Sequence, residues 1–217
     1  LDKSDERIEQ LTLELAEAHD EFMKVALELS EERSKSAKKL CKEIQNRLKG
    51  LDMSSATFSI EITPRDEANA FGVDNIQFLI STIPGKPPQP LSKVASGGEL
   101  SRVGLAMQVA IADRQTTPSL IFDEVDAGIG GTTGDAVGRQ LRELGEQAQV
   151  LCVTHLAQVA SKANNHLKVT KKNTRHGTTS QINQLSGDGV IQEIARMVGG
   201  DIESETSIAH AKEMIAN

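Results

Sequence analysis

The chain has 217 residues, of which 38% are hydrophobic and 25% are charged, and its formal net charge is −7. The negative balance argues against a generally basic nucleic-acid-binding surface, and five Phe with no Trp or Tyr argue against recognition by stacked aromatic rings. No apolar run approaches the roughly 20 residues of a membrane span, and Cys41 and Cys152 cannot build a disulfide framework, so we expect a cytoplasmic protein with no membrane partner.

Residues 1–50 contain no Pro, and Gly50 is their only Gly. Apolar residues recur here at alternating steps of three and four, at Ile8, Leu11, Leu15, Ala18, Phe22, Val25 and Leu29. This narrow stripe is typical of a coiled coil, although an amphipathic helix packed on a globular core is the alternative. The stripe breaks near Glu32 and resumes out of phase, which predicts an arm that ends in a short basic helix.

Charge is divided unevenly along this arm. Residues 1–32 hold eleven acids and three bases, whereas residues 33–49 hold seven bases and one acid. The basic segment 33–49 is either a DNA contact or a solvated helical face, and the sequence leaves both readings open.

Downstream, residues 57–63 and 75–81 alternate as strands, with a polar loop around Pro64 between them and a proline-rich linker at 84–90. Helical patterns at 101–114 and 134–146 then alternate with apolar strands at 119–122 and 150–154, which predicts a parallel sheet covered by helices. Residues 166–171 and 179–185 are expected to form an antiparallel pair, and helices are expected at about 189–198 and 206–216.

Three short segments carry candidate chemistry. The first strand of the parallel sheet ends in Asp123 and Glu124, at the edge where α/β folds bind ligands, although such acids often just lead a strand into solvent. Glycines before a helix, as in Ser96-Gly97-Gly98-Glu99, let backbone N–H groups approach an anion, although a simple capped helix explains them too. The second strand ends in His155, which is either a ligand-edge residue or a capped loop residue.

The order and spacing of these segments resemble ABC-type ATPases. Ser96–Ser101 looks like their signature motif, Leu120–Glu124 like their Walker B strand, Val125–Gly128 like their D-loop, and His155 like their switch histidine. The coiled arm narrows the resemblance to the SMC-like branch. The segments Lys93–Arg102, Leu120–Gly131 and Cys152–Ala160 resemble the RecN family of bacterial DNA-repair proteins, and the resemblance covers essentially the whole chain.

This resemblance implies a fold and a set of roles. The expected fold is α/β: residues 53–217 form the C-terminal lobe of an ABC/SMC-type P-loop ATPase head, and residues 1–52 form the base of the coiled-coil arm. Asp123 is expected to position Mg²⁺, Glu124 to act as the catalytic base and His155 to sense the γ-phosphate of ATP. Ser96, Gly97, Gly98 and Glu99 are expected to meet the ATP of a second head, and Asp126 to help join the two sites.

The phosphate-cradling Walker A loop is missing from this sequence. Gly85-Lys86 is the only Gly-Lys pair, Pro87 follows it, and Ile80 stands where the first Gly of the motif belongs. We therefore expect a fragment of a longer protein, whose N-terminal lobe supplies Walker A and which acts in double-strand break repair. The expected partners are that lobe, a second head and DNA, and the expected location is the cytoplasm, associated with the nucleoid. The alternatives are another SMC-like chromosome-organising or recombination ATPase, or a non-enzymatic coiled-coil module.

Overall fold

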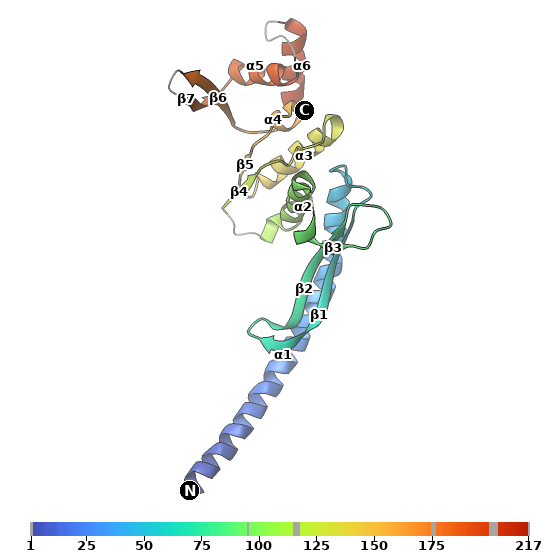
Figure 1. Cartoon of the computed structure of the whole chain (residues 1–217), viewed down its shortest axis with the longest axis vertical. Helices are drawn as coiled ribbons and strands as arrows, with labels where there is room; N and C mark the ends of the chain where they lie inside the picture. Colours follow the sequence, from blue (N-terminus) through green and yellow to red (C-terminus); the bar gives the residue numbers. More distant parts are fainter. Residues whose placement is uncertain (1, 95, 115–117, 175–176, 200–203, 217) are drawn as a thin grey trace. The chain divides into compact units, whose positions relative to one another are not determined.

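The computed structural model describes residues 2–94, 96–114, 118–174, 177–199 and 204–216. By the contacts among its residues the chain divides into two compact units. One comprises Leu1–Gln45 with Thr57–Lys93, and the other Asn46–Ala56 with Val94–Asn217. The predicted boundary between residues 52 and 53 stays a prediction; the contacts group the strands that follow residue 56 with the long helix (Figure 1).

The long helix, α1, runs without interruption from Asp2 to Lys49. The predicted separation of a short basic helix near Glu32 is therefore wrong. A polar residue in a seam weakens packing against a partner but leaves the backbone hydrogen bonds of the helix intact, and no helix breaker precedes Gly50. The seam residues Ile8, Leu15 and Val25 are 61%, 71% and 58% exposed, and the coiled coil that they predict stays a prediction.

An antiparallel hairpin lies along α1 in the same unit (Figure 1). It consists of β1 (Thr57–Asn69) and β2 (Gly72–Ser81), and the short β3 (Gln89–Pro90) pairs with β2 inside the predicted linker. The polar loop predicted around Pro64 is wrong, because β1 continues through it. The pairing register shifts between Pro64 and Asn69, as expected where proline cannot donate to the ladder.

The second unit contains the predicted parallel pair. After η1 (Leu91–Lys93), which ends the first unit, its elements are α2 (Gly97–Ala110), η2 (Ala112–Arg114), β4 (Ser119–Phe122), α3 (Gly131–Leu144), β5 (Gln149–Cys152) and α4 (Ala157–Ala160). Strands β4 and β5 run parallel, from Ser119 opposite Gln149 to Phe122 opposite Cys152. The helices surround a core whose fully buried members include Val103, Leu105, Val125, Val137 and Leu144.

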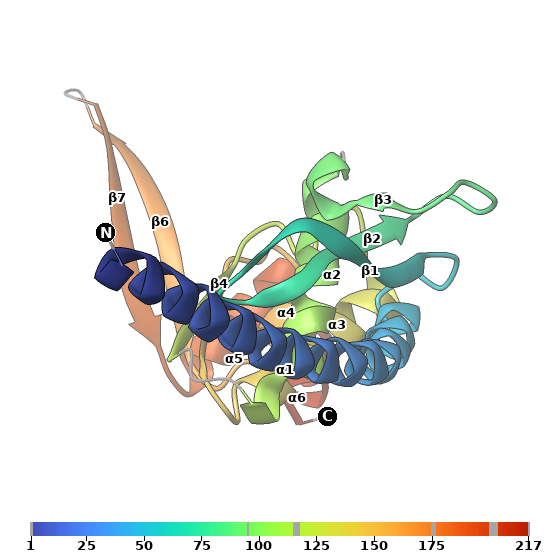
Figure 2. The same ribbon diagram turned by 90° about the horizontal axis from the view of Figure 1, so that it is seen from below.

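The rest of the second unit also follows the predicted pattern. Strands β6 (His166–Thr174) and β7 (Gly177–Leu185) form an antiparallel ribbon, which Figure 2 shows as a long two-stranded extension. Helices α5 (Asp188–Met197) and α6 (Glu205–Ala216) enclose a small core of Ile194, Ala195 and Ala211 with two residues of α4. Within the described residues, no helix has the length and apolar character needed to cross a bilayer.

Candidate functional site

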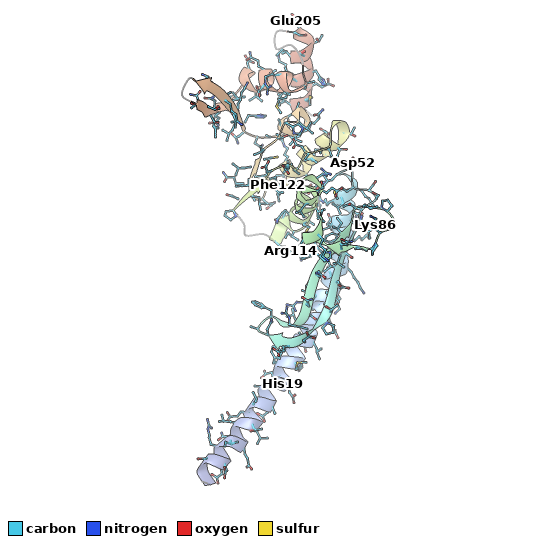
Figure 3. All side chains as sticks on the ribbon, in the orientation of Figure 1. His19, Asp52, Lys86, Arg114, Phe122 and Glu205 are labelled. Carbon is cyan, nitrogen blue, oxygen red and sulfur yellow. The ribbon has the colours of Figure 1, made fainter. Side chains whose placement is uncertain are left out.

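The carboxyl ends of β4 and β5 lie side by side. Phe122, labelled in Figure 3, ends β4 directly opposite Cys152, and the N–H of Val153 donates to the Phe122 carbonyl at 3.0 Å. Asp123 and Glu124 therefore follow one strand at the edge where His155 follows the other. The structure thus brings together, at the level of the strands, the acid pair and the histidine that the sequence singled out.

Glu124 has an unusual backbone conformation. Its φ is 57°, in the left-handed region that few residues other than glycine adopt, which costs on the order of 1 kcal/mol. Its N–H donates to Oδ1 of Asp123 at 2.9 Å, and both side chains are exposed. A strained turn that exposes two adjacent carboxylates is typical of a functional site rather than of a strand that merely ends.

Asp126 ties the loop after β4 to the loop that carries His155. Its carboxylate is 3% exposed, and Oδ2 accepts hydrogen bonds from the Thr154 hydroxyl, from the His155 N–H at 3.0 Å and from the Leu156 N–H at 3.3 Å. The ring Nδ1 of His155 lies 3.2 Å from the same oxygen, while the His155 side chain is 69% exposed. Asp126 therefore fixes the histidine loop from within the chain, and its predicted part in joining two sites stays a prediction.

The Ser96 loop caps α2 beside the acid pair. Ser96 is the N-cap, and its Oγ accepts from the Glu99 N–H at 3.4 Å. A Cβ added at Gly97 would lie 2.6 Å from Oε2 of Glu124, so this glycine and the candidate base are in close contact within one chain. A Cβ at Gly98 would lie 3.0 Å from the Ala127 carbonyl, so only glycine permits this approach without a shift.

Two residues of α2 that sequence reasoning did not single out hold the helix against the loop after β4. The Ser101 hydroxyl donates to the Asp123 carbonyl at 2.9 Å, and Nη1 of Arg102 donates to the Ala127 carbonyl at 3.0 Å. Arg102 is 7% exposed, and burial lowers the pKa of its guanidinium. Their position one helical turn after the glycines could have pointed to these two residues. Their hydrogen-bond acceptors are backbone carbonyls, which no side-chain pattern reveals.

The chemistry of the donor set bears on the predicted magnesium site. Within the described residues, no group of three or more His, Cys, Asp or Glu side chains is arranged to hold a metal ion. The exposed carboxylate of Asp123 does fit a hard cation whose other ligands are water and phosphate oxygens, which is how Mg²⁺ is usually bound in nucleotide sites. Asp123 as a magnesium ligand therefore stays a prediction, with a donor of the right kind.

Negative charge near the strand ends also affects Cys152. Burial and the neighbouring carboxylates of Asp126 and Asp123 raise the pKa of its thiol to about 12. The thiol borders a cavity of about 390 Å³ that Thr154 and Lys162 also line, whereas Asp123 and Glu124 do not line it. The Asp123 and Glu124 side chains are exposed, and the raised pKa of the Cys152 thiol is what a packing residue is expected to show.

Comparison with known proteins places these features in a family context. The family described as RecF/RecN/SMC N terminal domain matches residues 2–178. The chain is 46% identical over 217 residues to the DNA repair protein RecN of Vibrio cholerae serotype O1, covering 99% of this chain and 39% of the relative. It is 41% identical over 199 residues to RecN of Haemophilus influenzae, covering 91% of this chain and 36% of the relative. The chain thus spans well under half the length of these curated relatives.

Solved structures agree on the fold. The Smc head domain with a coiled coil and joint from Pyrococcus yayanosii aligns with a TM-score of 0.61 at 17% identity, over 88% of this chain and 35% of that chain. The Smc head domain with an extended coiled coil from Pyrococcus furiosus, bound to the C-terminal domain of ScpA, aligns with a TM-score of 0.58 at 18% identity, over 90% of this chain and 46% of that chain. These likenesses confirm the predicted α/β head fold with an attached long helix.

Proposed function

The chain belongs to the RecF/RecN/SMC family, and on that premise we propose that it forms the acid–base side of the ATP-hydrolysing head of a DNA-repair protein. The observation that carries the proposal is the register of β4 and β5, which brings Asp123 and Glu124 to the same sheet edge as His155. Family membership supports ATP as the substrate, and the relatives' name supports a role in DNA repair.

In the proposed reaction a water molecule attacks the γ-phosphorus of ATP and the bond to the β–γ bridging oxygen breaks. Glu124 orients the water and accepts its proton. His155 contacts a γ-phosphate oxygen through Nε2, because Nδ1 faces Asp126. Asp123 would hold Mg²⁺, which when bound supplies neutralisation of the phosphate charge. The protein's share of catalysis is therefore positioning and electrostatic stabilisation of a transferring phosphoryl group.

The Ser96 loop would serve the ATP of a second head. Ser96 and Gly97 are exposed at the N-terminus of α2, where the helix dipole favours an anion. The Glu99 N–H donates to the Ser96 side chain, which caps the helix. ATP held between two heads would join them, and hydrolysis would release them. This arrangement makes self-association of heads part of the catalytic cycle.

An exposed apolar face supports a further partner, the lobe that carries Walker A. Ile121, Leu151 and Val153 lie on one face of the two-stranded parallel sheet and are 76%, 41% and 63% exposed. Parallel sheets are normally covered on both faces, so this face is suited to packing against additional elements. We propose that the N-terminal lobe of the same protein covers it, and that the assembled protein acts on DNA in the cytoplasm.

The test is ATP turnover by the complete protein that carries this chain, wild type against Glu124→Gln. Glutamine keeps the size of the side chain and removes the base, so turnover is expected to fall by about a hundredfold or more while ATP still binds. The matched control is Glu146→Gln, an exposed glutamate outside the site, which leaves turnover unchanged. Turnover by Glu124→Gln equal to that of the control contradicts the assigned role.

A further inference from the structure

A lysine stripe runs along one face of α1. Lys35, Lys38, Lys39 and Lys42 are spaced i, i+3, i+4 and i+7, so they share one side of the helix, and all four are exposed. No acid occurs between Arg33 and Lys42 in the sequence. In a chain whose net charge is −7, this is a local reversal of charge on a single helical face.

The opposite face of α1 is held against the β1–β2 hairpin. Arg33 pairs with Asp74 at 2.7 Å, where the two side chains are 23% and 4% exposed. Further along, the Cys41 thiol donates to the Phe58 carbonyl at 3.5 Å, and the Phe58 N–H donates to the Gln45 side chain at 2.9 Å. These contacts fix the rotation of α1 against the hairpin, so the lysine stripe lies on the side of the helix turned away from β1 and β2.

Little within the chain neutralises the stripe. Lys35 pairs with Glu32 at 2.7 Å, but both side chains are well exposed and such surface pairs contribute little. Lys39 lies near enough to Glu32 to help lower the pKa of that exposed carboxyl, but among the described residues no ion pair within 4.0 Å is found for Lys38, Lys39 or Lys42. Three ammonium groups therefore point at solvent from two adjacent turns of a fixed helix.

We propose that Lys38, Lys39 and Lys42 bind the phosphate backbone of duplex DNA. Lysine contacts phosphate as a point charge, and the helix face carries no aromatic ring for stacking on bases, so the expected binding is independent of sequence. At about 1.5 Å of rise per residue the three lysines span roughly 6 Å, which suits a duplex with one charge per about 1.7 Å. The choice of DNA as the ligand rests on the proposed role in DNA repair, whereas the presence of the lysine stripe rests on the structure alone.

The experiment compares the complete protein with two triple variants of equal charge change. Lys38→Gln/Lys39→Gln/Lys42→Gln neutralises the stripe with a residue of good helix propensity. Lys86→Gln/Lys171→Gln/Lys172→Gln removes as many charges elsewhere. The probe is a fluorescein-labelled blunt duplex of about 30 base pairs, with anisotropy read between about 50 and 200 mM salt. Each lost phosphate contact should flatten the slope of log K against log salt by about 0.9.

The stripe variant is expected to lose about 2.7 from that slope and to bind on the order of tenfold or more weakly at the lowest salt, whereas the control keeps the wild-type slope. Lys38→Arg/Lys39→Arg/Lys42→Arg should restore binding, which separates charge from folding. A stripe variant with the wild-type slope overturns the inference, as does equal weakening in both triple variants. Stripe-dependent binding of poly-glutamate that exceeds binding of DNA also overturns it, in favour of an acidic protein partner. ATP turnover of the same samples bears on the proposed function separately.

Discussion

Replacing Asp126 by alanine removes the buried carboxylate that holds the histidine loop. The His155 N–H then loses its acceptor, whereas the Leu156 N–H keeps the Thr154 hydroxyl oxygen at 3.1 Å and the Thr154 hydroxyl keeps the Leu156 carbonyl at 3.4 Å. A stranded buried donor costs about 1–3 kcal/mol, and since the nearby exposed His155 side chain lets water reach the loop, we take the lower value and expect about 1 kcal/mol of destabilisation. Asp126→Asn is expected to cost less, because an amide oxygen in the place of Oδ2 still accepts from the His155 N–H without the charge.

Hydrogen exchange measures this effect where it arises. The His155 N–H should exchange roughly fivefold faster in Asp126→Ala, since each 1.4 kcal/mol is a factor of ten, and only slightly faster in Asp126→Asn. The Leu156 N–H, which keeps the Thr154 hydroxyl oxygen as an acceptor, should change less. Asp66→Ala, at an exposed position of β1, is the control and should leave both rates unchanged. Wild-type exchange of the His155 N–H in Asp126→Ala would refute the reasoning that this carboxylate anchors the loop.

Two further predictions follow from single contacts. Gly97→Ala places a Cβ 2.6 Å from Oε2 of Glu124, so it should displace that carboxylate and lower ATP turnover of the complete protein at least tenfold. The control is Gly104→Ala on the same helix, whose Cβ meets nothing within 4 Å; it should raise stability by about 0.5–1 kcal/mol and leave turnover intact. Equal turnover in the two variants would contradict the contact between Gly97 and Glu124. In a Cys41→Ser background, iodoacetamide at pH 8.5 should label Cys152 at least about tenfold more slowly in the folded chain than in urea, because its pKa is raised to about 12. Equal labelling rates would show that burial does not hold the thiol protonated. The raised pKa also makes stability depend on pH: the protonated thiol contributes fully below its unfolded pKa, near 9.0, and this contribution is lost as the pH rises through about 12.

The order of elements and the position of the acid pair were predictable from the sequence. One apolar run ends just before Asp123 and another ends shortly before His155, and such runs predict parallel strands. Parallel strands present their carboxyl ends at one edge of the sheet. The course of β1 through Pro64 was not predictable, because proline signals a loop unless a neighbouring strand holds it. The uninterrupted course of α1 was not predictable from the seam, because a change of phase in the apolar stripe indicates a change of packing partner and leaves the backbone hydrogen bonds of the helix intact.

The inner connections of the site lay beyond the sequence for a different reason. The partner of Asp126 is a hydroxyl and two backbone groups about thirty residues away, and backbone donors leave no trace in side-chain patterns. The positive φ of Glu124 was not predictable either, because glutamate has no preference for the left-handed backbone conformation. Motif spacing thus locates the candidate residues, whereas tertiary contacts decide how each is held.

The central claim is that Glu124 and Ser96 of one chain serve two different ATP molecules, and a mixing experiment tests it most directly. Glu124→Gln and Ser96→Arg forms of the complete protein should each be inactive alone. In an equal mixture, half of the dimers pair one of each and contain one site with an intact Glu124 from one head and an intact Ser96 from the other, so ATP turnover should recover to at most about a quarter of wild type. Because Glu124 lies against Gly97 within one chain, a single shared site is the competing arrangement, and a mixture as inactive as its components would contradict the account.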